Sequence, residues 1–403
     1  MNEIITLPRL EQLPYFIESN NLDGTNGSNR FDVTQCQLRA MNDYEAISCW
    51  LAEYQHKATT HRLYQKEVER LLLWCIFQQK KSLSSLDRED FARYFDFLSD
   101  PQPKALWCAP QGGRGRVRGD QYWRPFAGAL SQSTKNTTIT VINSLISYLT
   151  EGQYLRFNPL SLVRKRHQPS QSIEEQTLKV QERILELEEW YALLDTLEFL
   201  PESSLREKNE KERLRFLIAI LYFTGIRINE LTSHTWSAFR KVRDQWWLWV
   251  VGKGDKLGKI PVNDELLQVI IRFRTHLNYP SALPQFNDID PLIPSSHKTR
   301  ALSARYINKL LKKLAVLTAK IHFADQPEKV EKLKKFSAHW LRHLSASMQD
   351  RVGIQFKHIR ANHRHEHDET TRRYVHAWDH ERHADMQKLR LRINLSEVHQ
   401  ATK

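Results

Sequence analysis

The sequence predicts a mainly helical protein of two domains, with one small β-sheet in the second domain. Three observations predict this class. Apolar residues recur at helical spacing in both halves of the chain. A polar, proline-bearing stretch at residues 168–172 is typical of a linker between the halves. A single dense run of strand-forming residues, 246–251, is followed by a glycine-rich turn.

Length and charge limit the classes of protein to consider. The chain has 403 residues, which is enough for two domains with cores of their own. Its formal net charge of +13 favours a polyanionic partner, although ribosomal, regulatory and membrane-associating proteins share this property. No apolar run approaches the roughly 20 residues that span a bilayer, and the N-terminus lacks the pattern of a secretory signal. We therefore expect a cytoplasmic protein, associated with the nucleoid if its partner is DNA.

The first domain is expected to be a helical domain at residues 42–165, after an irregular N-terminal segment at residues 1–41. Turn-forming residues fill 20–24 and 26–29, so this segment is predicted to be a partner-binding or disordered tail. Helical periodicity then appears in four segments: 44–54, 64–75, 91–98 and 139–149. The third is preceded by the acidic start 87–90, and the fourth is expected to stop at Gly152. The cysteines show no C-x-x-C spacing, which disfavours a zinc site; Cys49 and Cys75 are expected in the core.

Between residues 101 and 125 the helical pattern lapses into a loop rich in glycine and arginine. Arg114, Arg116 and Arg118 are the candidate DNA-binding residues in this loop. Such a loop is either a solvated connector or a segment that orders its arginines on DNA phosphates. The sequence leaves both readings open.

The second domain is expected at residues 186–403, after a linker at 166–185. Helices are predicted around residues 188–200 and 213–223, followed by two strands at 246–251 and 259–262 around the turn 252–255. Beyond Pro294 the chain is predicted to be helical and strongly basic.

Candidate site residues begin with the segment 224–231. Gly225 interrupts one helix and lets the next begin close by, which presents Arg227 at a junction. A forked guanidinium at such a place can hold two phosphate oxygens. The alternative is a surface arginine paired with Glu230, one helical turn further on.

Lys253 lies between two glycines at the tip of the predicted hairpin. The glycines let the backbone approach a ligand, and the lysine can enter a groove or protonate a leaving oxygen. Lys256, in the same turn, is a further DNA-binding candidate. An exposed turn with solvated lysines is the alternative. The turn does not have the Walker spacing, so the sequence gives no support for nucleotide hydrolysis.

A histidine and an arginine, His339 and Arg342, share one face of a predicted helix, and His365 and Tyr374 follow in a stretch crowded with cations. A tyrosine hydroxyl is a poor nucleophile at neutral pH because its pKa is near 10. Groups that stabilise negative charge allow it to attack a phosphodiester and to hold the product covalently. The pattern suggests DNA cleavage through a phosphotyrosine; a hydrogen-bonded core histidine is the alternative for His339.

Several histidines lie between residues 358 and 383, and their alternation at 363–367 suggests a metal site as an alternative. This interpretation is disfavoured because Arg364 lies between the candidate ligands and repels a cation. We therefore expect no metal and no other cofactor.

Taken in order, four segments resemble the tyrosine recombinase (phage integrase) family: 224–231, 252–261, 339–342 and 365–374. Each motif is modest, but the four in the right order are a strong signal. Residues 42–165 resemble the core-binding domain of the family in pattern. The resemblance implies a two-domain DNA clamp, with a helical core-binding domain and a tyrosine-recombinase catalytic domain.

The resemblance also implies roles for the candidate residues. Arg227 corresponds to the first catalytic arginine, Glu230 to the acidic residue that supports its helix, and Lys253 to the hairpin lysine that protonates the departing 5′-oxygen. Neither metal nor ATP is required, because the covalent link conserves the bond energy.

The remaining roles belong to the C-terminal motifs. His339 and Arg342 correspond to the H-x-x-R pair, His365 to the second histidine, and Tyr374 to the nucleophile that leaves a 3′-phosphotyrosine and a free 5′-hydroxyl. The arginines would neutralise the non-bridging oxygens, while the imidazoles add proton transfer and hydrogen bonds.

The chain departs from the family pattern in two places. His363-Arg364 precedes the second histidine where the family usually has Leu-Gly, which leaves open whether His363, His365 or His367 faces the phosphate. Gly258 occupies the place of an arginine that often follows the hairpin lysines.

The expected function is a site-specific recombinase or integrase of a mobile element that cuts and rejoins double-stranded DNA. The resemblance implies a homotetramer on two synapsed sites, and accessory DNA-bending or partner recombinase proteins are possible partners. The segment from residue 377 to the C-terminus either docks on a neighbouring protomer or packs on its own chain. Two alternative functions are a type IB topoisomerase and a catalytically silent DNA-binding regulator of the same fold.

Overall fold

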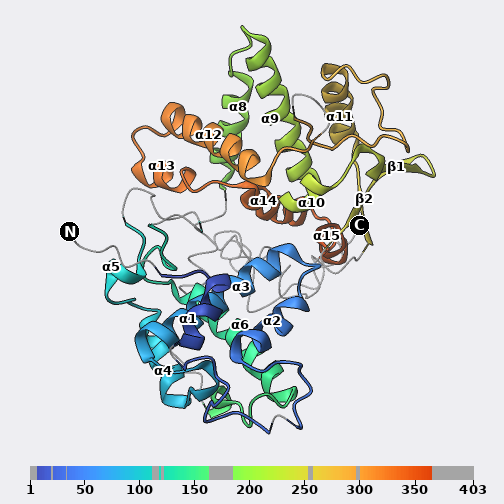
Figure 1. Cartoon of the computed structure of the whole chain (residues 1–403). Helices are drawn as coiled ribbons and strands as arrows, with labels where there is room; N and C mark the ends of the chain where they lie inside the picture. Colours follow the sequence, from blue (N-terminus) through green and yellow to red (C-terminus); the bar gives the residue numbers. More distant parts are fainter. Residues whose placement is uncertain are drawn as a thin grey trace, which may run out of the picture. The chain divides into compact units, whose positions relative to one another are not determined.

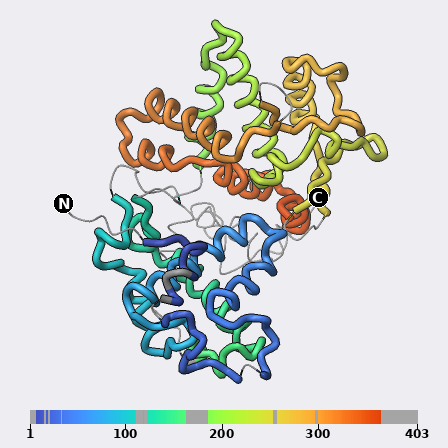
Figure 2. Tube along the Cα trace, viewed as in Figure 1, coloured from blue at the N-terminus to red at the C-terminus, as the bar shows by residue number. Residues whose placement is uncertain are grey.

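The computed structural model describes residues 7–19, 21–32, 34–110, 118, 122–162, 185–252, 257–295 and 300–364. The chain divides into two compact units, Met1–Gln168 and Pro169–Lys403. Helices dominate both units, and the described part holds one small sheet (Figures 1 and 2). The predicted class, mainly α with a small β-sheet, is therefore confirmed. None of the described helices combines the length and the apolar character that crossing a membrane requires.

In its described part, the regular secondary structure of unit 1 is helical, apart from isolated β-bridges. Its α-helices are α1 (Leu13–Ser19), α2 (Asp43–Ala52), α3 (Ala58–Trp74), α4 (Arg88–Phe97), α5 (Lys104–Trp107) and α6 (Gln132–Glu151). Short helical turns lie at Leu10–Gln12, Cys75–Gln79, Leu83–Ser85 and Pro159–Leu162. The apolar faces of α2, α3, α4 and α6 meet in one core, which explains the helical spacing of their apolar residues.

The ends of two helices follow the predicted signals. The Asp87 side chain accepts a hydrogen bond from the Asp90 backbone N–H and caps α4, as its acidic start indicated. Helix α6 stops at Gly152 as predicted. Cys75 is fully buried, whereas Cys49 is half-buried.

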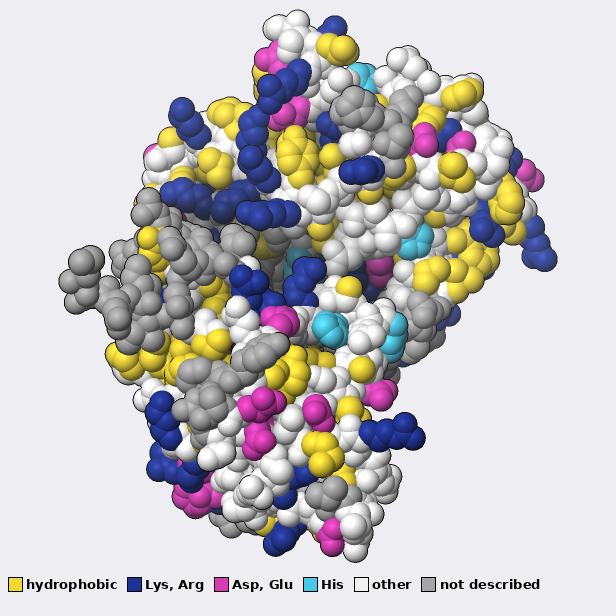
Figure 3. Space-filling model, viewed as in Figure 1, with side chains coloured by type: hydrophobic (Ala, Val, Ile, Leu, Met, Phe, Trp, Pro, Cys, Tyr) yellow, Lys and Arg dark blue, Asp and Glu magenta, His cyan; other side chains and the backbone are white. Residues whose placement is uncertain are grey.

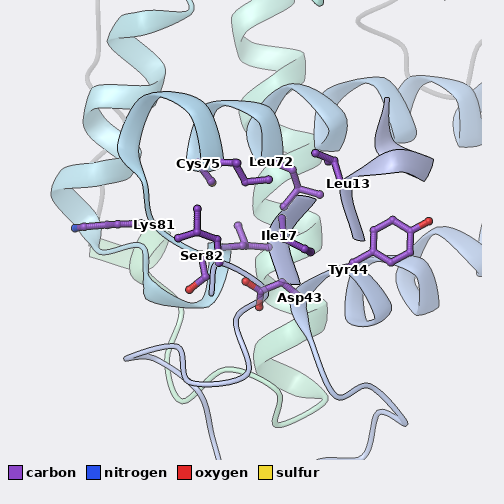
Figure 4. A pocket seen from close by; sticks show the side chains of 11 residues that line it. Leu13, Ile17, Asp43, Tyr44, Leu72, Cys75, Lys81 and Ser82 are labelled. Atoms are coloured by element: carbon purple, nitrogen blue, oxygen red, sulfur yellow. The ribbon is translucent and has the colours of Figure 1, made fainter. Parts of the chain in front are cut away.

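The N-terminal segment differs from the irregular tail that was expected. Leu7, Leu10, Leu13 and Ile17 are buried in the core of unit 1, and the backbone N–H of Leu10 donates to Glu69 Oε1 at 2.8 Å. Figure 4 shows the α1 side chains lining a pocket together with residues of α2 and α3. The buried leucines are three residues apart, a spacing that the neighbouring turn formers obscured in the sequence.

Unit 2 combines helices with the sheet. Its helices are α8 (Leu187–Glu198), α9 (Leu205–Thr224), α10 (Ile228–Ser233), α11 (Asp264–His276), α12 (Ala304–His322), α13 (Pro327–Leu333), α14 (Ala338–Arg351) and α15 (Phe356–His363), with a short turn at Trp236–Ala238. Helix α9 is central, because α8, α11 and α14 all pack against it. This packing brings segments that are more than 100 residues apart to the C-terminal end of α9.

The sheet is antiparallel, in the order β1 (Phe239–Val242), β2 (Gln245–Val251) and β3 (Leu257–Pro261). The two predicted strands are present, with Val250 opposite Gly258 and Val251 opposite Leu257. Strand β1 was missed. Its two-residue turn to β2 consists of Arg243 and Asp244, both with positive φ, whereas the sequence signal for such a turn is Asn-Gly or Asp-Gly.

Candidate active site

The junction after α9 positions the first candidate arginine. Helix α9 ends at Gly225, whose φ of +55° lies in the left-handed region that favours glycine. Arg227 then caps α10, and its backbone N–H donates to Glu230 Oε2 at 2.8 Å. Its guanidinium Nη1 donates to Glu230 Oε1 at 3.0 Å. A single carboxylate therefore fixes both the backbone and the side chain of Arg227.

Arg342 lies at the same junction, although it comes from a distant helix. It is 3% exposed on α14, which packs on α9. Its Nη1 donates to the carbonyl of Gly225 and its Nη2 to the carbonyl of His363. Arg342 thus joins the C-terminal ends of α9 and α15. Its partner at the end of α9, Gly225, comes two residues before Arg227 in the chain.

Two histidines flank Arg342 on α14. His339 is exposed, whereas His343 is buried, and their ring centroids lie 4.2 Å apart in an edge-to-face arrangement. Of the two histidines, His339 is therefore the one that a ligand could reach.

His363 occupies a structural position. It is fully buried, with Nε2 at 3.3 Å from Gln349 Nε2 and at 3.4 Å from Ser345 Oγ. Its ring lies against Gly225, where an added Cβ would come within 2.3 Å of His363 Cε1. This burial disfavours His363 as the histidine that faces a phosphate. His365 and His367 lie outside the described residues.

Sequence reasoning missed Arg364 as a member of this site. Arg364 follows α15 with a φ of +51°, and its Nη2 donates to Glu230 Oε2. Its side chain runs over Gly258 on β3. The signal that could have found it is the pair of departures from the family pattern, because His363-Arg364 and Gly258 meet in space.

His234 is a second residue that sequence reasoning missed. Its Nε2 accepts a hydrogen bond from the Val251 backbone N–H at 2.9 Å, so the ring proton is on Nδ1 and is donated to the Glu230 carbonyl at 2.7 Å. His234 therefore links α10 to the C-terminal end of β2.

Charge at Glu230 is determined by competing effects. Burial alone raises the pKa of this carboxyl group. The positive charge of Arg364, the Arg227 backbone N–H and the Arg227 guanidinium outweigh burial, and the pKa lies below its usual value. Glu230 is thus an anion held between two cations.

A comparison with models of protein families identifies one region of the chain. Residues 184–381 match the model of the phage integrase family. This region is a tyrosine recombinase (phage integrase) domain. Among curated proteins, none matches the chain by sequence.

Solved structures of tyrosine recombinases share the fold. The XerH site-specific recombinase bound to a palindromic difH substrate, in a post-cleavage complex, is 19% identical over 96% of this chain and 98% of that chain, with a TM-score of 0.56. The Tn1549 transposon integrase in complex with transposon right end DNA is 16% identical over 85% of this chain and 99% of that chain, with a TM-score of 0.51. At these identities the similarity shows the fold alone.

The tyrosine recombinase domain brings together three of its four sequence motifs through described residues: Gly225–Glu230, Gly258, and Arg342 with His363-Arg364. Four predicted site residues of this domain lie outside the described part: Lys253, Lys256, His365 and Tyr374. Within the described ranges there is no cluster of three or more His, Cys, Asp or Glu side chains that suits a metal ion.

The predicted DNA-binding arginines belong to unit 1. Arg114 and Arg116 lie outside the described residues. Arg118 Nη2 contacts Glu69 Oε1 and Glu11 Oε2, both at 2.7 Å. Glu69 is 2% exposed, so this ion pair ties the N-terminal segment to α3. Arg118 thus donates to two carboxylates through Nε and Nη2.

Proposed function

We propose that the chain is an active site-specific recombinase, which cuts and rejoins duplex DNA through a 3′-phosphotyrosine on Tyr374. The observation that carries this proposal is the convergence of Arg227 and Arg342 at the end of α9, with Arg342 bonded to the carbonyl of Gly225. Two guanidinium groups at one junction can offset the charge that develops on the non-bridging oxygens of a phosphodiester.

In the proposed reaction, the Tyr374 hydroxyl transfers its proton to a histidine of the site, and its oxygen attacks the phosphorus. The phosphorus–5′-oxygen bond breaks, and Lys253 gives a proton to the departing 5′-oxygen. His339 and His365 hydrogen-bond the phosphate and assist proton transfer. Attack by a 5′-hydroxyl of another strand reverses these steps and releases Tyr374, so the number of phosphodiester bonds is conserved.

The proposed substrate is double-stranded DNA, held mainly through its phosphates. Helix α12 has an exposed basic face, to which Arg305, Lys309, Lys312, Lys313 and Lys320 contribute. Figure 3 shows Lys and Arg side chains gathered over the α12–α13 region. Such a face supplies sequence-independent affinity that weakens as salt rises. A homotetramer on two synapsed sites and a role in a mobile element belong to the same proposal.

The test is a nicked suicide substrate, made from the cleavage site mapped on the DNA that flanks the gene. The wild-type protein is expected to accumulate a covalent adduct, while Tyr374→Phe binds the same DNA and forms none. Tyr191→Phe, at an exposed position on α8, is the matched control and is expected to form the adduct at the wild-type rate. Tight binding without any adduct would show a silent regulator. Relaxation of plasmids without a target site would show a topoisomerase.

A further inference from the structure

Two arginine side chains, those of Arg227 and Arg364, meet at Glu230. Glu230 Oε1 accepts from Arg227 Nη1, while Oε2 accepts from the Arg227 backbone N–H and from Arg364 Nη2. The two arginines are unequally exposed: the side chain of Arg227 is 44% exposed and that of Arg364 is 12% exposed. Glu230 is therefore bound by Arg364 on its protein-facing side and by Arg227 on its solvent-facing side.

Two local features determine where the Arg364 side chain lies. Its backbone adopts the left-handed conformation, which a residue with a side chain adopts at a cost. Gly258 supplies the second feature. A Cβ at position 258 would lie 2.5 Å from Arg364 Cδ and 3.1 Å from Arg364 Cγ, so any other residue there must displace the arginine. Arg364 Nη1 also donates to the Asn362 carbonyl at 3.1 Å, which fixes the guanidinium.

The charge balance shows what Arg364 contributes. Arg227 and Glu230 alone form a neutral pair, in which the carboxylate competes with a phosphate for the guanidinium. With Arg364 the cluster carries one net positive charge, and the carboxylate is already shared with a second donor. Among the described residues, the Arg227 guanidinium donates only to Glu230, through Nη1. Its Nε and Nη2 can therefore donate to another acceptor.

We infer that Arg364 is a positioning residue of the strand-cleaving site. It binds Glu230, so that the Arg227 guanidinium keeps its orientation and its positive charge stays available for the scissile phosphate. Gly258, which has no side chain, leaves the space that Arg364 occupies. This inference rests on the proposed function. Arg364 acts on the site only through its contact with Glu230.

The experiment measures adduct formation in a single turnover, with full-length protein at saturating suicide substrate, beside the DNA dissociation constant and the thermal midpoint. Arg364→Ala is expected to slow adduct formation about 10- to 100-fold, because Arg227 is misplaced, while the dissociation constant changes less than about threefold. Arg364→Lys restores a cation and is expected to recover part of the rate.

Arg364→Gly separates positioning from stability. It removes the same guanidinium and also relieves the left-handed backbone, so its thermal midpoint is expected to exceed that of Arg364→Ala. A positioning role predicts the same slow cleavage in both variants. A purely structural role predicts that the rate follows the midpoint, and this result would overturn the inference.

Gly258→Ala tests the accommodation of Arg364. The added methyl is expected to displace the arginine and to slow cleavage in the wild-type background, but to add nothing in the Arg364→Gly background. Lys357→Ala, an exposed position on α15, controls for the loss of one positive charge and is expected to cleave at the wild-type rate.

The outcomes distinguish the two proposals. If wild-type protein forms the adduct and Arg364→Ala forms it equally fast, the positioning role fails and the recombinase proposal stands. If wild-type protein forms no adduct on a bound substrate, the recombinase proposal fails, and the positioning role falls with it.

Discussion

At the scale of single residues, Asp43 shows how burial changes the chemistry of a side chain. Its carboxylate is 2% exposed and accepts hydrogen bonds from the Ser84 backbone N–H at 3.0 Å and from the Tyr154 hydroxyl at 2.9 Å. Burial raises its pKa to about 6, although these hydrogen bonds act in the opposite direction. The protonated form is therefore more populated in the folded protein than in the unfolded chain.

This shift predicts a pH dependence of stability. Between about pH 4 and pH 6 the folded state binds the Asp43 proton more tightly than the unfolded state, so this group stabilises the fold as pH falls. Relative to Asp43→Asn, the wild-type protein is expected to gain on the order of 2–3 kcal/mol between pH 7 and pH 4. Urea titrations of both proteins across this range measure the difference. A constant difference would contradict the raised pKa.

Residues also show the limit of what local sequence predicts. The pairing of Arg227 with Glu230 was open to prediction, because three positions on a helix start determine it. The ion pair of Arg118 with Glu69 was not, since it joins residues 49 positions apart. Arg118 was accordingly predicted to lie either in a solvated connector or on a DNA phosphate, and its pairing with Glu69 and Glu11 is seen only in the folded chain.

At the scale of elements, the end of α9 depends on one glycine for two reasons. Gly225 adopts a left-handed φ, and its Cα faces the His363 ring at a distance that leaves no room for a methyl group. Backbone conformation and packing therefore both require glycine at this position.

Gly225→Ala is expected to destabilise unit 2 by about 2–4 kcal/mol, as the sum of backbone strain and a forced shift of His363. Gly353→Ala is the matched control, because Gly353 also has a positive φ, of +81°, but open space around its Cα. It is expected to cost about 1 kcal/mol. Denaturant titrations measure the free energy of unfolding of both variants. Equal losses of stability would show that His363 can move aside without destabilising the fold.

The link from α10 to the hairpin predicts a local effect. His234→Phe removes both ring nitrogens and thus the bonds to the Val251 N–H and the Glu230 carbonyl. The global stability is expected to change by less than about 1 kcal/mol, because Val251 is 46% exposed and water can replace the lost partner. Hydrogen exchange of the β2 end is expected to accelerate about tenfold. Unchanged exchange would mean that His234 does not hold the hairpin.

At the scale of the whole molecule, each unit has a hydrophobic core of its own. The core of unit 1 is built from residues 7–160 and that of unit 2 from residues 185–344. Separate cores are the physical condition for independent folding.

The fragment of residues 1–168 is therefore expected to fold alone and to unfold cooperatively, with a free energy of unfolding on the order of 5 kcal/mol. The fragment of residues 169–403 is expected to do the same. Circular dichroism during urea titration measures both. A gradual, non-cooperative transition of either fragment would mean that its core needs the rest of the chain.

The sequence by itself determined the fold class, the positions of most helices and strands, and the order of the recombinase motifs. These features are local, because periodicity, caps and turn residues act within a few positions of each other. Tertiary structure alone decided that Arg364 binds Glu230 over Gly258, that His363 packs on Gly225, and that the N-terminal leucines are buried. The partners in these contacts lie far apart in the chain, and a side chain meets such a partner only where the packing of whole elements brings it.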